Sequence, residues 1–188
     1  MDEAAAEFTD QQLANARAGD RTALAALIHA HQRSVYSLAL RMLGTRDLAE
    51  DLTQDVFMQL NDKLKSIASR THLAFWLRKV TTHRAIDQLR RRSSMQMTPL
   101  DDEDELFSNT QGGDPLLQRH LRVLLAQLSP PARAVLLLRY QEDLDPVDIA
   151  RTLDMPINTV KSHLQRSLEV LRQGTPGAQR TRCEDKSI

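Results

Sequence analysis

Apolar residues recur every three or four positions along most of the chain, which is the spacing of amphipathic helices. Helix-capping residues interrupt this pattern near the N-terminus. Thr9 and Asp20 are of types that begin helices, and Gly19 and Gly44 are of the type that ends them. The sequence therefore predicts a short helix over 10–18 and a longer one between Asp20 and Gly44.

A third helix is predicted over 46–61, with Thr45 as its cap. Its apolar positions are Ala49, Leu52, Val56 and Leu60. The opposite face carries what we call the acidic strip, defined by Asp51, Gln54, Asp55 and Met58. Solvated acids are ordinary on a helix surface, but an acidic strip can also dock a basic partner. The spacing alone leaves both interpretations open.

The segment 62–70 breaks the helical pattern and is expected to form a basic loop. A helix over 71–92 follows, in which basic residues accompany aromatic ones and whose last three residues are arginines. Basic residues stabilise a helix C-terminus through the dipole. Three of them after an aromatic and basic helix favour a track for phosphates instead. Trp76 is a candidate base-stacking platform or core anchor, and its apolar neighbours favour the core.

The C-terminal part begins with a helix whose leucines run from Leu117 to Leu128, including Leu121. Ser129 and the two prolines after it suit the start of the next helix. That helix is expected to bury Val135, Leu136 and Leu138.

Two further helices flank a short turn. Asp145 and Pro146 open the first, because Asp accepts from free amides and Pro has a preset helical φ. Its inward positions are expected to be Val147, Ile149, Ala150 and Leu153. Pro156 ends it, since proline disfavours a helical residue before it. Asp154 stands where such a turn commonly has glycine, and Asp tolerates the left-handed conformation better than most residues.

The second of these helices combines an apolar stripe with a polar face. The stripe consists of Val160, Leu164, Leu168 and Leu171. The polar face is rich in donors for phosphates and base edges: Asn158, Thr159, Lys161, Ser162, His163, Gln165 and Arg166. This pattern favours a DNA-binding helix-turn-helix over two helices that merely pack.

Composition and charge support an all-α chain of two small helical domains. Only 4% of the 188 residues are aromatic and Gly and Pro are few. The net charge is zero, yet residues 93–117 hold six acidic and no basic residues, while the blocks on either side are mildly basic. Such a polar stretch predicts a flexible acidic linker. The expected organisation is a domain over 1–92, the linker 93–117, a four-helix domain with the helix-turn-helix over 118–173, and a polar tail, 174–188.

No catalytic, metal or cofactor site is predicted. The six histidines are scattered and Cys183 is the one cysteine, so neither a zinc cluster nor a disulfide framework is expected. No Gly-rich phosphate loop or nucleophile-base arrangement is present. No apolar run approaches the ~20 residues of a membrane span, and no signal-peptide pattern follows the acidic start. A cytoplasmic protein that is not an enzyme is expected.

Two blocks of residues, in this order, resemble a bacterial RNA polymerase sigma factor of the extracytoplasmic-function type. The N-terminal block contains Ala49-Glu50-Asp51-Leu52-Thr53-Gln54-Asp55-Val56-Phe57, Trp76-Leu77, Ala85-Ile86-Asp87 and Leu89-Arg90-Arg91-Arg92. The C-terminal block contains Leu128-Ser129-Pro130, Arg133, Leu138, Tyr140, Asp148-Ile149-Ala150, Asn158-Thr159-Val160-Lys161-Ser162 and Arg166. The order of the two blocks makes the resemblance specific, which a helix-turn-helix alone would not be.

The resemblance implies a subunit that binds core RNA polymerase, through the clamp helices of its largest subunits and its flap, and directs promoter-specific initiation. It places the acidic strip on the clamp helices. It implies that promoter DNA is bound both double- and single-stranded, and that the minus-ten element is read and melted by Lys63, Lys65, Arg70, Lys79, His83, Arg90 and Arg91. It places the polar face of the second helix of the helix-turn-helix in the major groove of the minus-thirty-five element.

The resemblance also implies a linker that follows the RNA exit path of the polymerase, and it makes control by an anti-sigma factor plausible. Three residues depart from the family pattern. His83 and Arg84 stand where Asn and an aliphatic residue are commoner, and His163 stands where Arg often follows Lys-Ser. These departures shift which promoter bases are read. The alternative hypothesis is a stand-alone helix-turn-helix regulator, which leaves the acidic strip without a purpose.

Overall fold

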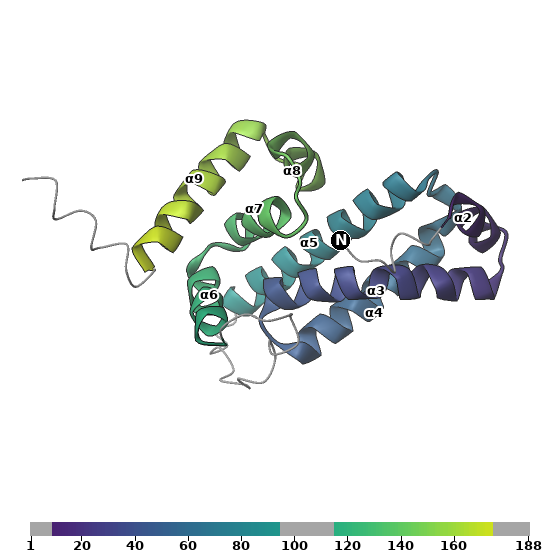
Figure 1. Ribbon diagram of the computed structural model, residues 1–188, viewed down its shortest axis with the longest axis horizontal. Coiled ribbons are helices and arrows are strands. Elements are labelled where there is room, and N and C mark those ends of the chain that lie inside the picture. Colours follow the sequence, from purple (N-terminus) through teal and green to yellow (C-terminus); the bar gives the residue numbers. More distant parts are fainter. Residues whose placement is uncertain (1–8, 95–114, 175–188) are drawn as a thin grey trace, which may run out of the picture. The chain divides into compact units, whose positions relative to one another are not determined.

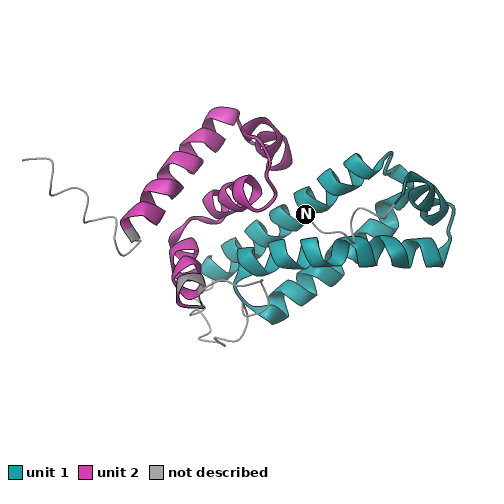
Figure 2. Cartoon of the chain, viewed as in Figure 1, with its two compact units in different colours: residues 1–98 teal, residues 99–188 magenta. Residues whose placement is uncertain are grey.

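The computed structural model describes residues 9–94 and 115–174, and every regular element in these ranges is a helix. The all-α prediction is therefore confirmed. The chain divides into two compact units, residues 1–98 and 99–188 (Figure 2). Most of the predicted acidic linker and nearly all of the polar tail lie outside the described residues.

Unit 1 consists of α2 Asp10–Arg17, α3 Arg21–Leu43, α4 Arg46–Lys63, the 3-10 turn η1 Leu64–Ser66 and α5 Arg70–Ser94. The four α-helices are labelled in Figure 1. The long α3 is central and packs against α2, α4 and α5. Its side chains Leu27, Leu38 and Met42 are almost completely buried. Because this core holds the inner faces of α4 and α5, the outer faces of both helices stay available to solvent.

Three of the predicted helix ends in unit 1 have the expected chemistry. Thr9 and Gln12 form a reciprocal capping box, in which the Thr9 amide donates to Gln12 Oε1 at 2.7 Å. The Asp20 carboxylate accepts from two amides in the first turn of α3. Gly44 ends α3 with φ +84°, in the left-handed region that favours glycine. The predicted side-chain cap of α4 is wrong, because the buried Thr45 hydroxyl bonds to no described residue.

The predicted loop over 62–70 is wrong for most of its length. Helical structure continues from α4 through Ser66, and α5 already begins at Arg70. The reason is the burial of Leu64 and Ile67, which are 4% and 1% exposed. These two side chains anchor a segment whose other residues, except Ala68, are polar, and their burial favours compact helical structure over an open loop.

Unit 2 has the predicted four helices within residues 115–174: α6 Pro115–Gln127, α7 Pro130–Tyr140, α8 Pro146–Thr152 and α9 Ile157–Gly174. The long α9 packs against the other three. The predicted core positions Val135, Leu136 and Leu138 are buried in α7. Ser129 occupies the N-cap position of α7 without a side-chain cap bond, so the expected capping contact is absent there.

Two predicted core positions of unit 2 are exposed instead. Val147 is 45% exposed because it lies two residues, or about 200° of helical rotation, from the fully buried Ile149. Leu121 is 44% exposed, whereas Leu124, three positions later on α6, is 6% exposed. Hydrophobic spacing identified both helices correctly, but the buried face of each helix is narrower than the sequence predicted.

Candidate functional site

The acidic strip forms an exposed face of α4. The opposite face fixes its orientation, because Ala49, Leu52, Val56 and Leu60 are all buried. Asp51, Gln54 and Asp55 are exposed, and Met58 exposes 64% of its surface. Methionine is one of the residue types enriched in protein interfaces. The four strip residues therefore share one accessible ridge.

One member of the strip is tied to the neighbouring helix. Arg84 of α5 donates from Nη1 to Asp55 Oδ2 at 3.1 Å, and from Nε to Gln59 Oε1 at 3.1 Å. Asp55 and Gln59 are one helical turn apart, so a single guanidinium spans both. The sequence analysis noted Arg84 only as a departure from the family pattern. Its contact with the strip depends on how α4 packs on α5, and no spacing rule reveals that.

The residues predicted for the minus-ten element lie in two places in unit 1. Lys63, Lys65 and Arg70 are exposed around η1, between α4 and α5. Lys65 also lines an open cleft of about 320 Å³, together with Ala14 and Arg17 of α2 and Ala18 directly after it. The junction of α4 and α5 is therefore a solvent-facing basic surface.

The remaining minus-ten residues lie along α5. Lys79 and His83 are half-buried, whereas Arg90 and Arg91 are exposed near the helix C-terminus. The Lys79 ammonium lies 6.0 Å from the centroid of the Phe75 ring, at the limit of a cation–π contact. Positive charge and aromatic surface thus alternate along one helix, a combination suited to single-stranded nucleic acid.

Trp76 is half-buried, so the core assignment favoured by the sequence holds only for part of the ring. The core positions of this part of α5 are Leu73 and Leu77, which are 0% and 3% exposed. These two leucines are four positions apart, which places them on one face of the helix. Trp76 lies beside that face and is partly open to solvent.

His31 of α3 lies near two arginines of α5, which the sequence analysis did not foresee. Burial lowers the pKa of His31 from its ordinary value of 6.5, and the charges of Arg70 and Arg78 lower it further. His31 is therefore neutral at pH 7, and the positive charge in this region belongs to the arginines. The grouping arises from the packing of α3 on α5 and has no signature in local spacing.

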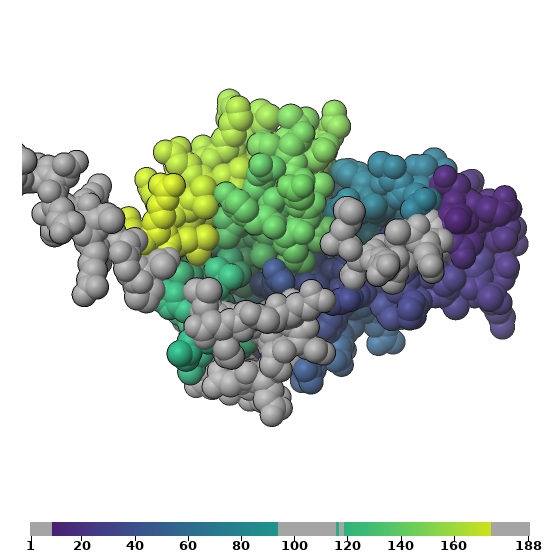
Figure 3. All heavy atoms as spheres, in the orientation of Figure 1, coloured from purple at the N-terminus to yellow at the C-terminus, as the bar shows by residue number. Residues whose placement is uncertain are grey.

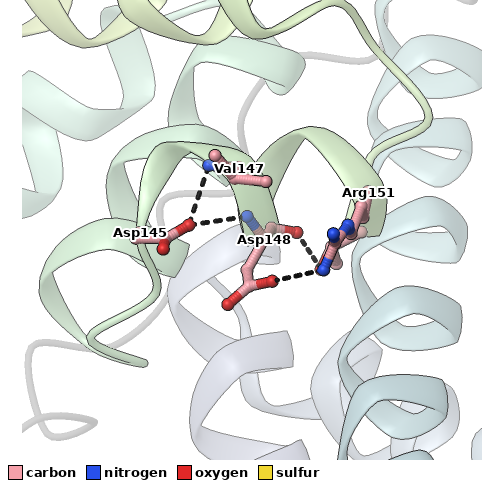
Figure 4. Close-up of polar contacts among 5 residues, drawn as sticks. Asp145, Val147, Asp148 and Arg151 are labelled. Atoms are coloured by element: carbon pink, nitrogen blue, oxygen red, sulfur yellow. Dashed lines mark hydrogen bonds and ion pairs between the residues drawn. The ribbon is translucent and has the colours of Figure 1, made fainter.

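In unit 2, the first helix of the helix-turn-helix is capped as predicted. The Asp145 carboxylate accepts from the amides of Val147 and Asp148, both at 2.8 Å (Figure 4). Asp148 also pairs with Arg151 at 3.3 Å on the outer face of α8 (Figure 4). The cap and this pair stabilise a helix that is only seven residues long.

The turn between α8 and α9 has the predicted geometry. Asp154 adopts φ +50°, the left-handed conformation expected at that position. The Met155 amide closes the turn by donating to Ala150 O at 3.0 Å. Val160 is completely buried, as predicted for the residue that locks the two helices together. This turn and the buried Val160 fix the orientation of α9 relative to α8.

The polar face of α9 is open to solvent. Six of the seven predicted minus-thirty-five residues are exposed: Asn158, Thr159, Lys161, Ser162, Gln165 and Arg166. His163 is half-buried. Part of the surface of α9, coloured yellow-green, is visible in Figure 3. The Ser162 hydroxyl donates to Asn158 O at 2.9 Å, which leaves its oxygen available as an acceptor.

Three buried polar residues of unit 2 were not expected in the core: Arg133, Thr152 and Ser167. Arg133 of α7 is 9% exposed, and its Nε donates to Leu125 O at 2.9 Å. Burial lowers the pKa of Arg133. Ser167 of α9 is 1% exposed, and its hydroxyl bonds to no described residue. Arg133 thus ties α7 to the last turn of α6, where Leu125 O also accepts from the Leu128 amide at 3.1 Å.

Metal and membrane sites were also sought in residues 9–94 and 115–174. No group of three or more His, Cys, Asp or Glu side chains there is arranged to hold a metal ion. None of the helices there is long and apolar enough to cross a membrane.

Two family models match the chain, one in each unit's helical region. The model of sigma-70 region 2 matches residues 27–95, and that of sigma-70 region 4 matches residues 118–171. The first match spans α4 and α5 with the acidic strip and all seven predicted minus-ten residues, and the second spans the helix-turn-helix. The order of the two regions agrees with the order of the two blocks in the sequence.

Relatives of known type extend the match beyond these regions. The extracytoplasmic-function (ECF) sigma factor SigE of Mycolicibacterium smegmatis is 31% identical over 163 residues, which cover 82% of this chain and 63% of that longer protein. SigW of Bacillus subtilis, also an ECF sigma factor, is 25% identical over 181 residues, which cover 87% of this chain and 94% of SigW.

Solved structures support the fold. The sigma factor RpoE of Bartonella quintana, solved with the anti-sigma factor NepR, has a TM-score of 0.61 and 22% identity, and the match covers 76% of this chain and 90% of RpoE. CnrH, solved with the cytosolic domain of CnrY, has a TM-score of 0.65 and 17% identity, and the match covers 89% of this chain and 96% of CnrH. With both sigma-70 regions present in order, the chain belongs to the sigma-70 family of RNA polymerase sigma factors, in the extracytoplasmic-function group.

Proposed function

We propose that this chain is a promoter-specificity subunit that binds core RNA polymerase through α4, contacts opened minus-ten DNA through η1 and α5, and binds the minus-thirty-five duplex through α9. The observation that carries the proposal is the presence of an exposed acidic strip and an exposed donor-rich recognition helix in one chain that matches both sigma-70 regions. A stand-alone regulator would need only the helix-turn-helix and gives no reason for the region 2 match.

The acidic strip orients the chain on the polymerase and increases the rate of association. Carboxylates on one ridge attract a basic partner surface, and the exposed Met58 adds apolar contact area in the same patch. We assign Asp51, Gln54, Asp55 and Met58 to the contact with the polymerase. The expected partner surface is basic, with a shallow apolar patch opposite Met58.

The minus-ten surface must hold a strand whose bases are unpaired. Such binding combines cations for the backbone with aromatic surface for the bases. Exposed Lys63, Lys65 and Arg70 supply cations near η1, and α5 supplies the half-buried Trp76 beside Lys79. The domain boundaries proposed for these tasks are 1–92 for docking and the minus-ten element and 118–173 for the minus-thirty-five element.

The minus-thirty-five element is an intact duplex, for which a recognition helix is suited. A major groove about 12 Å wide admits one α-helix, and residues near its N-terminus reach the base edges. Asn158, Thr159 and Ser162 occupy the first two turns of α9, while Lys161 and Arg166 add charge along it. Sigma factors are regulatory proteins without a catalytic role, so the polymerase supplies the chemistry. Because core polymerase and promoters are cytoplasmic in bacteria, the proposal places this chain there.

The test is reconstitution with purified core polymerase. The full chain should co-elute with core enzyme at low salt, and the complex should give discrete run-off transcripts from genomic fragments. Core enzyme alone is the control. A chain that neither binds core nor yields transcripts, but binds duplex DNA specifically by itself, would instead be a stand-alone regulator.

A further inference from the structure

Arg84 makes a two-point contact with α4 beside the acidic strip. Its Nη1 donates to Asp55 Oδ2 and its Nε to Gln59 Oε1, both at 3.1 Å. A guanidinium has five N–H donors in a rigid plane, so two contacts in different directions fix its orientation. The Nη1 contact reaches Oδ2 of Asp55, whose side chain is still 59% exposed.

This contact is poorly placed to stabilise the fold. The side chains of Arg84 and Asp55 are 42% and 59% exposed, and exposed ion pairs add little to stability. Burial of apolar side chains stabilises these helices instead: Val56 and Leu60 of α4 and Ala85 of α5 are each 0% exposed. A planar two-point contact on an already stable pair of helices is better suited to controlling the orientation of Asp55.

We infer that Arg84 is a positioning residue for polymerase docking: it holds the Asp55 carboxylate in one orientation, in which the carboxylate accepts from a basic side chain of the partner. The inference rests on the proposed function of the acidic strip. A carboxylate that is already oriented loses less rotational freedom on binding than one that rotates freely.

The charge of Arg84 acts in the opposite direction, because it repels a basic partner. If long-range electrostatics were the only effect of Arg84, removing its charge would strengthen docking. Measurements at low and high salt separate this repulsion from the restraint that Arg84 places on Asp55. The Debye length is about 8 Å at 0.15 M ionic strength and shorter above it, so repulsion between exposed charges fades at high salt. The restraint on Asp55 acts over a direct contact of 3.1 Å and should persist.

The experiment measures the affinity of the full-length chain for purified core polymerase, at 50 mM and 300 mM salt. The variants are Arg84→Ala, Arg84→Lys, Asp55→Asn and the double variant with Asp55→Asn and Arg84→Ala. Arg46→Ala is the matched control, because it removes the same charge from the exposed first turn of α4. Thermal unfolding of each variant checks that the fold is intact.

Arg84→Ala should weaken core binding about two- to tenfold at 300 mM salt, which corresponds to freeing one side chain. The loss should disappear in the Asp55→Asn background, and Arg84→Lys should restore part of the affinity because it keeps a donor for Asp55. Arg46→Ala should leave affinity at 300 mM salt unchanged.

Three results would overturn the inference. Equal losses with and without Asp55 would mean that Arg84 touches the polymerase directly. Tighter binding of Arg84→Ala at 300 mM salt would make Arg84 a competitor for Asp55. Unchanged binding of Arg84→Ala would show that the contact has no role in docking. Failure of the proposed function is distinguishable, because the unaltered chain would then not bind core at all.

Discussion

Truncation of Arg166 to alanine tests the assignment of α9 as the recognition helix. Arg166 is exposed and forms no ion pair or side-chain hydrogen bond with any described residue. Removing it should therefore change the free energy of unfolding by no more than about 0.5 kcal/mol. Any larger effect on promoter binding then reports a contact with DNA.

The position of Arg166 makes the outcome informative. Arg166 comes eight positions after Asn158, so it lies about 12 Å further along the helix axis. A bidentate contact with a guanine contributes about 1–3 kcal/mol of discrimination, or a roughly 5- to 150-fold change in affinity. A phosphate contact would instead weaken binding to all sequences alike.

The assay compares promoter binding by holoenzymes reconstituted with the unaltered chain, Arg166→Ala and the control Arg172→Ala. Arg172 is exposed on the same helix but lies outside the predicted set. Each base pair of the minus-thirty-five element is substituted in turn. We expect Arg166→Ala to lose discrimination at one base pair. A uniform loss, with the dependence of log K on log salt reduced by about one unit, would refute the base contact. Unchanged affinity would refute any role in DNA binding.

Three further predictions concern the other parts of the chain. Reversing Asp51 and Asp55 to lysine should abolish co-elution with core polymerase while circular dichroism stays unchanged; retained binding would refute the docking assignment. Arg133→Ala should lower the free energy of unfolding of unit 2 by about 2–4 kcal/mol, because it removes a charge-assisted bond and buried packing, as measured by urea denaturation. The lowered pKa of His31 means that the unfolded chain binds its proton more readily, so stability should fall as pH drops below about 6.5, and His31→Gln should flatten that slope.

Local capping rules correctly predicted three helix starts, at Thr9, Asp20 and Asp145, and failed at the buried Thr45 hydroxyl and at the exposed Ser129. Asp20 and Asp145 both cap as expected, because their carboxylates can rotate freely onto the first-turn amides. The failure at Thr45 has a tertiary cause. Its hydroxyl is buried, so packing rather than the local capping preference decides its direction.

Helical periodicity identified which segments are helices but less reliably which residues are buried. The 62–70 segment was misread because its polar residues outnumber its apolar ones, yet burial of Leu64 and Ile67 determines its conformation. Val147 and Leu121 show the opposite error, because they were predicted to be buried and are exposed. Their helices are amphipathic, but the neighbouring helices cover only part of each apolar face.

The sequence by itself determined the all-α class, the helix-turn-helix with Asp154 in its turn, and the two blocks that identify the family. These features depend on residues close together in the chain, and hydrophobic spacing, capping and turn preferences record them directly. Only the tertiary structure decided that Arg84 reaches Asp55, that His31 lies near Arg70 and Arg78, and that Arg133 ties α7 to α6. Each of these contacts joins different helices, and the packing of side chains from several helices sets their distances, which no single segment encodes.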